Sequence, residues 1–450
     1  MSYEDLKVGQ FRTANWLKNY TSKLISADDA LKVIKSGDNL VIQPGCAVPM
    51  ELVRAMVRRK DELHDVKIYH ILTVGQMPYL EPGMEEHFRH TAFFIGSNAR
   101  KAINDGRADF MPIFLSEVPL LFKNGIIKPD VALINVSPPD EHGFCSYGVD
   151  VGTIKTAAEK SNIIIAQVNR KMPRALGDCF IHINKIHYVV EHEEAIQELP
   201  QVDSDITDDM WDIYNTIGQY IADLIEDGST LQMGIGAIPD SVLKFLKSKK
   251  DLGVHTEMFS DGIIELVDEG IVNNEKKTLH PGKIIAGFVL GTKRSFDFIN
   301  NNPIVEFHPQ EYVNDPFVIA RNNKMVAINS AIEVDLTGQV CADSIGTRFY
   351  SGIGGQVDFV RGAARSEGGK PIIALPSTTK DFKISRIVPA LKPGAGVVTS
   401  RGDVHYIVTE YGVAHLYGKT IKQRAQALIN VAHPAFRDEL SRYARENFKI

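Results

Sequence analysis

The chain repeats one order of elements twice, and this duplication constrains its fold more than any other feature. Residues 26–45 begin with a serine closely followed by two aspartates, continue as a helical pattern, turn at a glycine, and reach a glycine loop after a short apolar strand. Residues 207–236 follow the same order from a threonine, with the turn and loop glycines separated by the same number of residues. A Ser or Thr before acidic residues is typical of a helix start.

Further segments recur in matching order along the two halves. The pairs are 131–143 with 325–338, 163–168 with 371–376, and 187–190 with 405–408. A general likeness among α/β units is the alternative explanation, but four matches in one order favour a duplication. Short apolar strands between helical patterns predict parallel sheets covered by helices.

We therefore expect an α/β fold of two structurally similar domains with mainly parallel sheets. The predicted domains are residues 1–200 and 201–450, joined within the acid-rich segment 191–209. A length of 450 residues suits two domains. Ligands of such sheets bind at the carboxyl ends of the strands, which predicts an active site at the domain interface.

Composition excludes several classes of protein. The chain is 44% hydrophobic and 24% charged, which is typical of a globular protein. A net charge of −6 argues against a nucleic-acid partner, so an anionic ligand needs a locally basic pocket. The sequence has no apolar run of membrane-spanning length and does not start with a signal-peptide pattern. Four scattered cysteines without a CxxC pair predict reduced thiols in a cytoplasmic protein and neither disulfides nor a metal site.

A first glycine loop lies in the second half, after a predicted strand over 229–233 and before a predicted helix over 240–247. Its residues are Gly234, Ile235, Gly236, Ala237 and Ile238. Glycines let a ligand approach the backbone, and the start of the following helix offers N–H groups to a phosphate. The loop does not fit the GxGxxG pattern, which disfavours an NAD-linked enzyme. A tight turn without a ligand is the alternative.

A second glycine loop and one carboxylate complete the candidate site. Residues 351–355 hold three glycines, ending at Gly355, whose backbone amides could stabilise an oxyanion; close packing is the alternative. Glu257 follows a short apolar segment and is flanked by Met and Phe, a placement that fits a catalytic carboxylate. A surface glutamate beside a turn is the alternative.

Taken together, these motifs resemble the acetyl-CoA hydrolase/transferase family of class I CoA-transferases, with 4-hydroxybutyrate CoA-transferases as the nearest members. The resemblance covers nearly the whole chain and is carried by GIGAIPD, HTEMFSDG, SIGTRFYSGIGGQVDFVRG and VTEYGVAHL in this order, with GDNLVIQPG and VSPPDEHGFCSYGV in the first half.

This resemblance implies a role for each candidate residue. Glu257 matches the catalytic glutamate, residues 234–238 match a loop that binds coenzyme A (CoA), and Gly355 lies in a segment that contacts CoA and supports the oxyanion hole. A lysine of the following loop would face CoA; Lys383 is preferred, with Lys380 left open. Ile332 is a weaker candidate for the wall of the CoA pocket.

The resemblance also implies a reaction. CoA moves between an acyl-CoA and a short-chain carboxylic acid by a ping-pong route through a glutamyl-CoA thioester, with no metal or tightly bound cofactor. The expected acids are 4-hydroxybutyrate and acetate, with butyrate and itaconate-type acids open. From the geometry of the repeat alone, segments 45–50 and 136–147 are expected to contact the acid. A homodimer or larger homo-oligomer is expected. The alternatives are an acyl-CoA hydrolase that uses the same glutamate and a non-catalytic CoA-binding protein.

Overall fold

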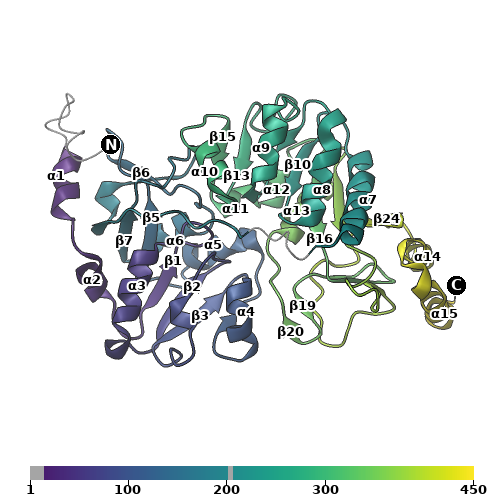
Figure 1. Cartoon of the computed structure of the whole chain (residues 1–450), viewed down its shortest axis with the longest axis horizontal. Helices are drawn as coiled ribbons and strands as arrows, with labels where there is room; N and C mark the ends of the chain where they lie inside the picture. Colours follow the sequence, from purple (N-terminus) through teal and green to yellow (C-terminus); the bar gives the residue numbers. More distant parts are fainter. Residues whose placement is uncertain (1–14, 201–205, 450) are drawn as a thin grey trace. The chain divides into compact units, whose positions relative to one another are not determined.

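A computed structural model describes residues 15–200 and 206–449 of the protein. The described residues form two compact units (Figure 1). The first unit contains the residues up to Leu199 together with Ile285–Tyr312, and the second contains Pro200–Ile284 and the residues from Val313 onward.

The first unit is built on a seven-stranded sheet in the order β4-β3-β2-β1-β5-β7-β9. Its strands are β1 (Asn39–Ile42), β2 (Val66–His70), β3 (Phe88–Ala92), β4 (Asp109–Phe110), β5 (Val131–Val136), β7 (Ile163–Val168) and β9 (Tyr188–Glu191). Every neighbouring pair is parallel. The helices of this unit are α1 (Asn15–Ser22), α2 (Ala27–Ala30), α3 (Met50–Arg58), α4 (Ser97–Asn104), α5 (Val118–Lys123), α6 (Ile154–Lys160) and α10 (Lys293–Ile299). An antiparallel pair of β6 (Phe144–Ser146) and β8 (Phe180–His182), with β14 (Phe288–Val289) and β15 (Val305–Phe307), completes it.

The second unit is built on a six-stranded sheet in the order β11-β10-β16-β21-β23-β24. Its strands are β10 (Thr230–Met233), β11 (Gly253–Val254), β16 (Met325–Ser330), β21 (Lys370–Ala374), β23 (Tyr406–Thr409) and β24 (Gly412–His415). All neighbours are parallel except β23 and β24. Its main helices are α7 (Asp208–Leu224), α8 (Ala237–Phe245), α9 (Asp261–Asp268), α12 (Pro316–Ile319), α13 (Gln356–Arg365), α14 (Ile421–Val431) and α15 (Arg437–Phe448). Short strands in its loops are β12 (Met258–Phe259), β17 (Glu333–Asp335), β18 (Val340–Cys341), β19 (Ser344–Ile345), β20 (Arg348–Phe349) and β22 (Ile387–Val388). The chain passes from one unit to the other within β13 (Ile284–Ala286) and again within α11 (Gln310–Val313).

The two sheets confirm the predicted α/β class and the duplicated order of strands. The neighbours β1-β5-β7-β9 of the first sheet correspond in chain order and in sheet order to β10-β16-β21-β23 of the second. Both copies also begin with a capped helix, because Ser26 accepts the backbone N–H of Asp29 and Thr207 accepts that of Met210. The first of these helices is shorter than the pattern predicts, since α2 gives way after Ala30 to a single 3-10 turn.

Segment 285–312 belongs to the first unit, whereas the predicted boundary placed it in the second domain. It packs within the first unit because its backbone bonds to that unit: Val151 N–H and Gly152 N–H donate to Gly287 O, and Phe307 N–H donates to Leu176 O. Such long-range backbone pairing leaves no local mark in the sequence.

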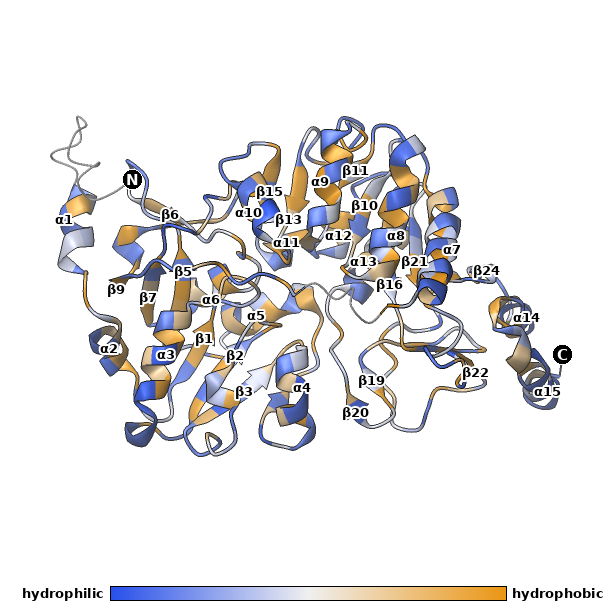
Figure 2. Cartoon of the chain, in the orientation of Figure 1, coloured by the Kyte–Doolittle hydropathy of each residue, from blue (hydrophilic) through white to orange (hydrophobic). Residues whose placement is uncertain are grey.

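The cores follow from strands buried on both faces. All six residues of β5 are buried, and β7 is buried beyond its first residue, as continuous apolar runs in a covered parallel sheet require. Figure 2 shows hydrophobic residues along the strands, whereas the helices carry both hydrophobic and hydrophilic faces. All four cysteines are buried. Among the described residues, no helix is both long and apolar enough to cross a membrane.

Candidate active site

The candidate site is assembled at the carboxyl edge of the sheet in the second unit. The first glycine loop leaves β10, Glu257 follows β11, and Ser330 ends β16. These three strands are parallel neighbours, so their carboxyl ends lie at one edge of the sheet. The segment after β21, which carries Lys380, leaves the sheet at the same edge.

Glu257 is held by two buried neighbours in the sequence. His255 N–H donates to Leu231 O at 3.1 Å, which extends the pairing of β11 with β10 by one residue. Thr256 Oγ1 lies 3.3 Å from Met233 O and 3.1 Å from Met258 O. The side chains of His255 and Thr256 are fully buried, while that of Glu257 retains partial exposure. The backbone at Glu257 is therefore fixed, and its carboxylate can still be reached.

Asn314 is the direct partner of this carboxylate. Its Nδ2 donates to Glu257 Oε2 at 3.1 Å and lies 3.3 Å from Asp358 Oδ2. Both Asn314 and Asp358 are buried. Asn314 was not predicted from the sequence, because Asn-Asp-Pro before a helix is an ordinary helix-start pattern, and here Asp315 caps α12. Nothing in the sequence distinguishes an asparagine that merely precedes a helix N-cap from one whose amide belongs to the active site.

Gly355 lies against the same carboxylate. A Cβ atom placed on Gly355 would overlap Glu257 Oε2 and Asn314 Nδ2. The φ angle of Gly355 is −93°, so glycine is required here by close approach and not by its backbone conformation. Gly355 is the N-cap of α13, and Gln356 anchors this helix start by donating to Ser330 O at 2.8 Å.

The electrostatics of Glu257 follow from this packing. Removal from solvent raises its pKa to about 7, while the hydrogen bond from Asn314 acts in the opposite direction. A carboxylate with a pKa near 7 is partly ionised at neutral pH and more nucleophilic than an ordinary surface glutamate.

The first glycine loop is open. Gly236, at φ 109°, caps α8, which begins at Ala237, three residues before the predicted start at Asp240. The prediction was wrong because Pro239 lies in the first helical turn, where a proline needs no N–H partner. A Cβ atom on Gly234 or Gly236 would meet nothing within 4 Å.

The side chains of this loop differ in exposure. Ile235 is 39% exposed, whereas Ile238 is buried at 8% exposure. Ala237 is half-buried. A ligand at the loop would therefore meet the Gly234–Ala237 backbone, while the Ile238 side chain faces the core.

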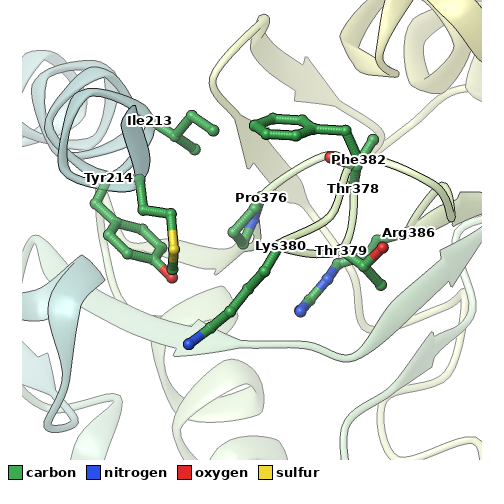
Figure 3. A pocket seen from close by; sticks show the side chains of 9 residues that line it. Ile213, Tyr214, Pro376, Thr378, Thr379, Lys380, Phe382 and Arg386 are labelled. Carbon is green, nitrogen blue, oxygen red and sulfur yellow. The ribbon is translucent and has the colours of Figure 1, made fainter. Parts of the chain in front are cut away.

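The two candidate lysines lie in different surroundings. Lys380 lines a small pocket between α7 and the segment 376–386 (Figure 3). Its lining residues are Met210, Ile213, Tyr214, Pro376, Thr378, Thr379, Lys380, Phe382 and Arg386. The Lys383 side chain is 79% exposed, and its Nζ lies 3.7 Å from Asp381 Oδ2. Arg386 adds a second, partly buried cation to the pocket; burial lowers its pKa, and the nearby Tyr214, Tyr350 and Glu410 counteract this.

Ile332, the weaker candidate for the wall of the CoA pocket, lies between β16 and β17. Its backbone N–H donates to Cys341 O at 2.9 Å, and its side chain is half-buried. No group of three or more His, Cys, Asp or Glu side chains within 15–200 and 206–449 is arranged to hold a metal ion.

Comparison with known proteins identifies the family. The profile of the acetyl-CoA hydrolase/transferase N-terminal domain matches residues 10–199, and that of the C-terminal domain matches residues 291–444. The chain is 52% identical to the 4-hydroxybutyrate coenzyme A transferase of Clostridium kluyveri over 96% of this chain and 100% of that protein. The chain belongs to the acetyl-CoA hydrolase/transferase family.

Other members of the family agree with this assignment. A Fasciola hepatica protein named succinyl-CoA:acetate/propanoyl-CoA:succinate CoA transferase is 50% identical over 94% of this chain and 88% of its own length. The crystal structure of 4-hydroxybutyrate CoA-transferase from Porphyromonas gingivalis matches with a TM-score of 0.82 and 41% identity, covering 96% of this chain and 100% of that one. The family is an enzyme family, and these relatives are CoA-transferases that act on CoA thioesters.

Proposed function

We propose that this enzyme transfers CoA between an acyl-CoA and a short-chain carboxylate, with Glu257 as the nucleophile. The observation that carries the proposal is the packing of the Glu257 carboxylate against Gly355, with Asn314 Nδ2 donating to Oε2. A thioester is an activated acyl donor, so a carboxylate can attack it directly.

The reaction begins when a Glu257 oxygen attacks the thioester carbonyl carbon. The C–S bond breaks, CoA leaves as a thiolate, and an acyl–glutamyl anhydride remains. The thiolate then attacks the Glu257 side-chain carbonyl and releases the first acid as its carboxylate, which leaves a glutamyl-CoA thioester. An acceptor carboxylate attacks this thioester and the same steps run in reverse. Each step exchanges one nucleophile for one leaving group, so no external acid, base or oxidant is consumed.

Asn314 and the start of α13 have distinct roles in this scheme. When the thiolate attacks the Glu257 carbonyl, negative charge develops on the glutamate oxygen itself. Asn314 Nδ2, which lies 3.1 Å from Oε2, is placed to stabilise that charge. The N–H groups at Gly355 and Gln356 lie at a helix start, where the helix leaves them without internal partners. Because these donors are in place before the reaction, little reorganisation is needed.

We propose that the first glycine loop and the Lys380 pocket bind the anionic and pantetheine parts of CoA. The open backbone at Gly234 and Gly236 supports a close approach, and α8 offers its N-terminus to a phosphate. Lys380 and Arg386 supply local positive charge in a chain of net charge −6. We favour Lys380 over Lys383 for this contact, because only Lys380 lines the pocket.

The acid pair is proposed from the relatives. 4-Hydroxybutyrate with acetate or acetyl-CoA is favoured, because the relative that is 52% identical is named for 4-hydroxybutyrate. Butyrate remains the second candidate. Segments 45–50 and 136–147 of the first unit are proposed to contact the acid.

Acceptor dependence tests the transferase activity. The enzyme is mixed with 4-hydroxybutyryl-CoA or butyryl-CoA, and thioester loss is followed with and without excess acetate. A transferase consumes the thioester rapidly only with acetate and forms an equal amount of acetyl-CoA. Equal rates without acetate, with free CoA accumulating, would favour the hydrolase that the family description also names. Binding without consumption in either case would favour a non-catalytic CoA-binding protein.

A further inference from the structure

His255 lies two residues before Glu257 and is completely buried within the second unit. Its Nε2 lies 2.8 Å from the main-chain oxygen of Val313. A carbonyl oxygen can only accept, so Nε2 carries the proton and donates. Asn314 is the next residue after Val313, so this bond fixes the peptide that carries the amide partner of Glu257.

The same imidazole contacts the helix that begins beside Glu257. The rings of His255 and Phe359 are 6.2 Å apart between centroids and inclined at 62°. Phe359 lies in the first turn of α13, and its N–H donates to Gly355 O at 3.0 Å. His255 therefore contacts the peptide before Asn314 and the turn that starts at Gly355, while its own chain leads to Glu257.

The backbone that carries His255 is itself held rigidly. β11 is an edge strand, and side chains of segment 274–277 occupy its free side. Asn274 Oδ1 accepts the N–H of Val254 at 2.9 Å, and Lys277 Nζ donates to Val254 O at 2.8 Å. Both side chains are buried, and a buried ammonium is stable only when its hydrogen bonds are made. Any displacement of Val254 would break these bonds, so the backbone from which the His255 imidazole extends is fixed in position.

We propose that His255 is a positioning residue for Glu257, which sets the spacing between the Glu257 carboxylate, the Asn314 amide and the Gly355 backbone. This inference rests on the proposed role of Glu257 as nucleophile. His255 acts through its bond to Val313 O and its packing on Phe359, without contact to the substrate. Misplacement of a reacting group by about 1 Å can cost on the order of 10²-fold in rate.

Two substitutions separate the hydrogen bond from the ring. His255→Phe keeps an aromatic ring beside Phe359 but has no donor for Val313 O. His255→Gln loses the ring but carries a donor of similar reach. The single-turnover rate of CoA adduct formation on Glu257 is measured with butyryl-CoA and no acceptor, alongside steady-state kcat and KM. We expect His255→Phe to slow adduct formation and kcat roughly 10²-fold with KM little changed, and His255→Gln to stay within about tenfold of wild type.

A matched control comes from the first unit. His90 is also buried, and its Nδ1 lies 3.1 Å from Ile68 O. His90→Phe is expected to lower stability without changing the adduct rate per folded enzyme. A purely structural role of His255 would give the same result and would overturn the inference.

Two further outcomes are decisive. If His255→Phe does not fold, His255→Asn replaces it, because the shorter amide does not reach Val313 O; equal adduct rates in the Gln and Asn variants would contradict the inference. Absence of an adduct in the wild-type enzyme would instead overturn the nucleophilic role of Glu257, and this inference with it.

Discussion

Asn314 and Glu257 are joined by a hydrogen bond of 3.1 Å from the amide Nδ2 to the carboxylate Oε2. Asn314 is completely buried, so bulk water does not compete for this donor. The bond favours the ionised carboxylate, whereas burial favours the protonated form and raises the pKa of Glu257 to about 7. The balance between the two effects leaves a nucleophilic carboxylate available at neutral pH.

Removal of the amide donor should shift this balance. Asn314→Leu is similar in size but cannot donate, so the pKa of Glu257 should rise further. We expect kcat/KM at pH 7 to fall by about 10²–10³, the usual cost of losing one oxyanion donor. The comparison is Asn430→Leu, at an exposed position of α14. Wild-type kinetics in Asn314→Leu would contradict a role for this hydrogen bond.

The pH dependence of the first half-reaction follows from the same carboxylate. Attack on the thioester requires ionised Glu257, and its pKa is raised to about 7. The rate of adduct formation should therefore rise with pH, reach half of its maximum near pH 7, and level off above. Rapid-quench measurements from pH 5.5 to 9, a range chosen around that pKa, test this. A rate that is constant down to pH 5.5 would show that an unperturbed carboxylate reacts.

The raised pKa also predicts an effect on stability. Between the ordinary glutamate pKa and about 7, the folded state binds more protons at Glu257 than the unfolded state, so stability falls as pH rises through this window. Above pH 7 the charge on this largely desolvated carboxylate lowers the free energy of unfolding. Glu257→Gln should therefore stabilise the protein by on the order of 1–3 kcal/mol at pH 8 and have little effect at pH 4. Urea unfolding of both proteins at the two pH values measures the difference in the free energy of unfolding. Equal stabilities at pH 8 would show that the Glu257 charge does not destabilise the folded protein.

Gly355→Ala should damage the site without damaging the fold. At φ −93° alanine is allowed, but its Cβ would overlap Glu257 Oε2 and Asn314 Nδ2. We expect kcat to fall at least about 10²-fold through displacement of the carboxylate. Gly402→Ala is the matched control, because its nearest neighbour would be Ser400 Oγ at 3.6 Å. Similar kcat values for the two variants would contradict the close approach of Gly355 to the Glu257 carboxylate.

The two lysines of the loop after β21 should differ in their effect on CoA binding. Lys380→Ala removes a cation from the pocket that also contains Arg386. KM for acyl-CoA should rise about tenfold or more, as expected for a charge-assisted hydrogen bond. Lys383→Ala should behave as wild type, because this exposed side chain lies beside Asp381. The reverse result would assign the contact to Lys383.

The strands of the two sheets could be predicted because the sequence pattern that specifies each strand lies within the strand itself. The apolar runs at 131–136 and 163–168 have the composition of strands buried on both faces, and the structure places them as β5 and β7. The matched order of the two halves likewise appears as matched neighbours in the two sheets. In these segments the local preference for strand agrees with the packing of the whole sheet, and such agreement allows the fold to be predicted from the sequence.

The parts that were missed depend on contacts between distant residues. Segment 285–312 joins the first unit through bonds such as Phe307 N–H to Leu176 O, which no local pattern specifies. Asn314 meets Glu257 across 57 residues of chain, and the sequence marks it only as a neighbour of a helix cap. Glu257 and Gly355 were predicted as separate features, and their direct packing emerges only in three dimensions.

A chemical trap at Glu257 tests the proposed nucleophile most directly. The enzyme is incubated with butyryl-CoA and no acceptor acid, and its intact mass and peptides are analysed before and after treatment with hydroxylamine or borohydride. We expect a CoA adduct on the peptide that contains Glu257, removed or reduced by the reagent and absent in Glu257→Ala. Binding or hydrolysis of butyryl-CoA without any adduct at Glu257 would contradict it.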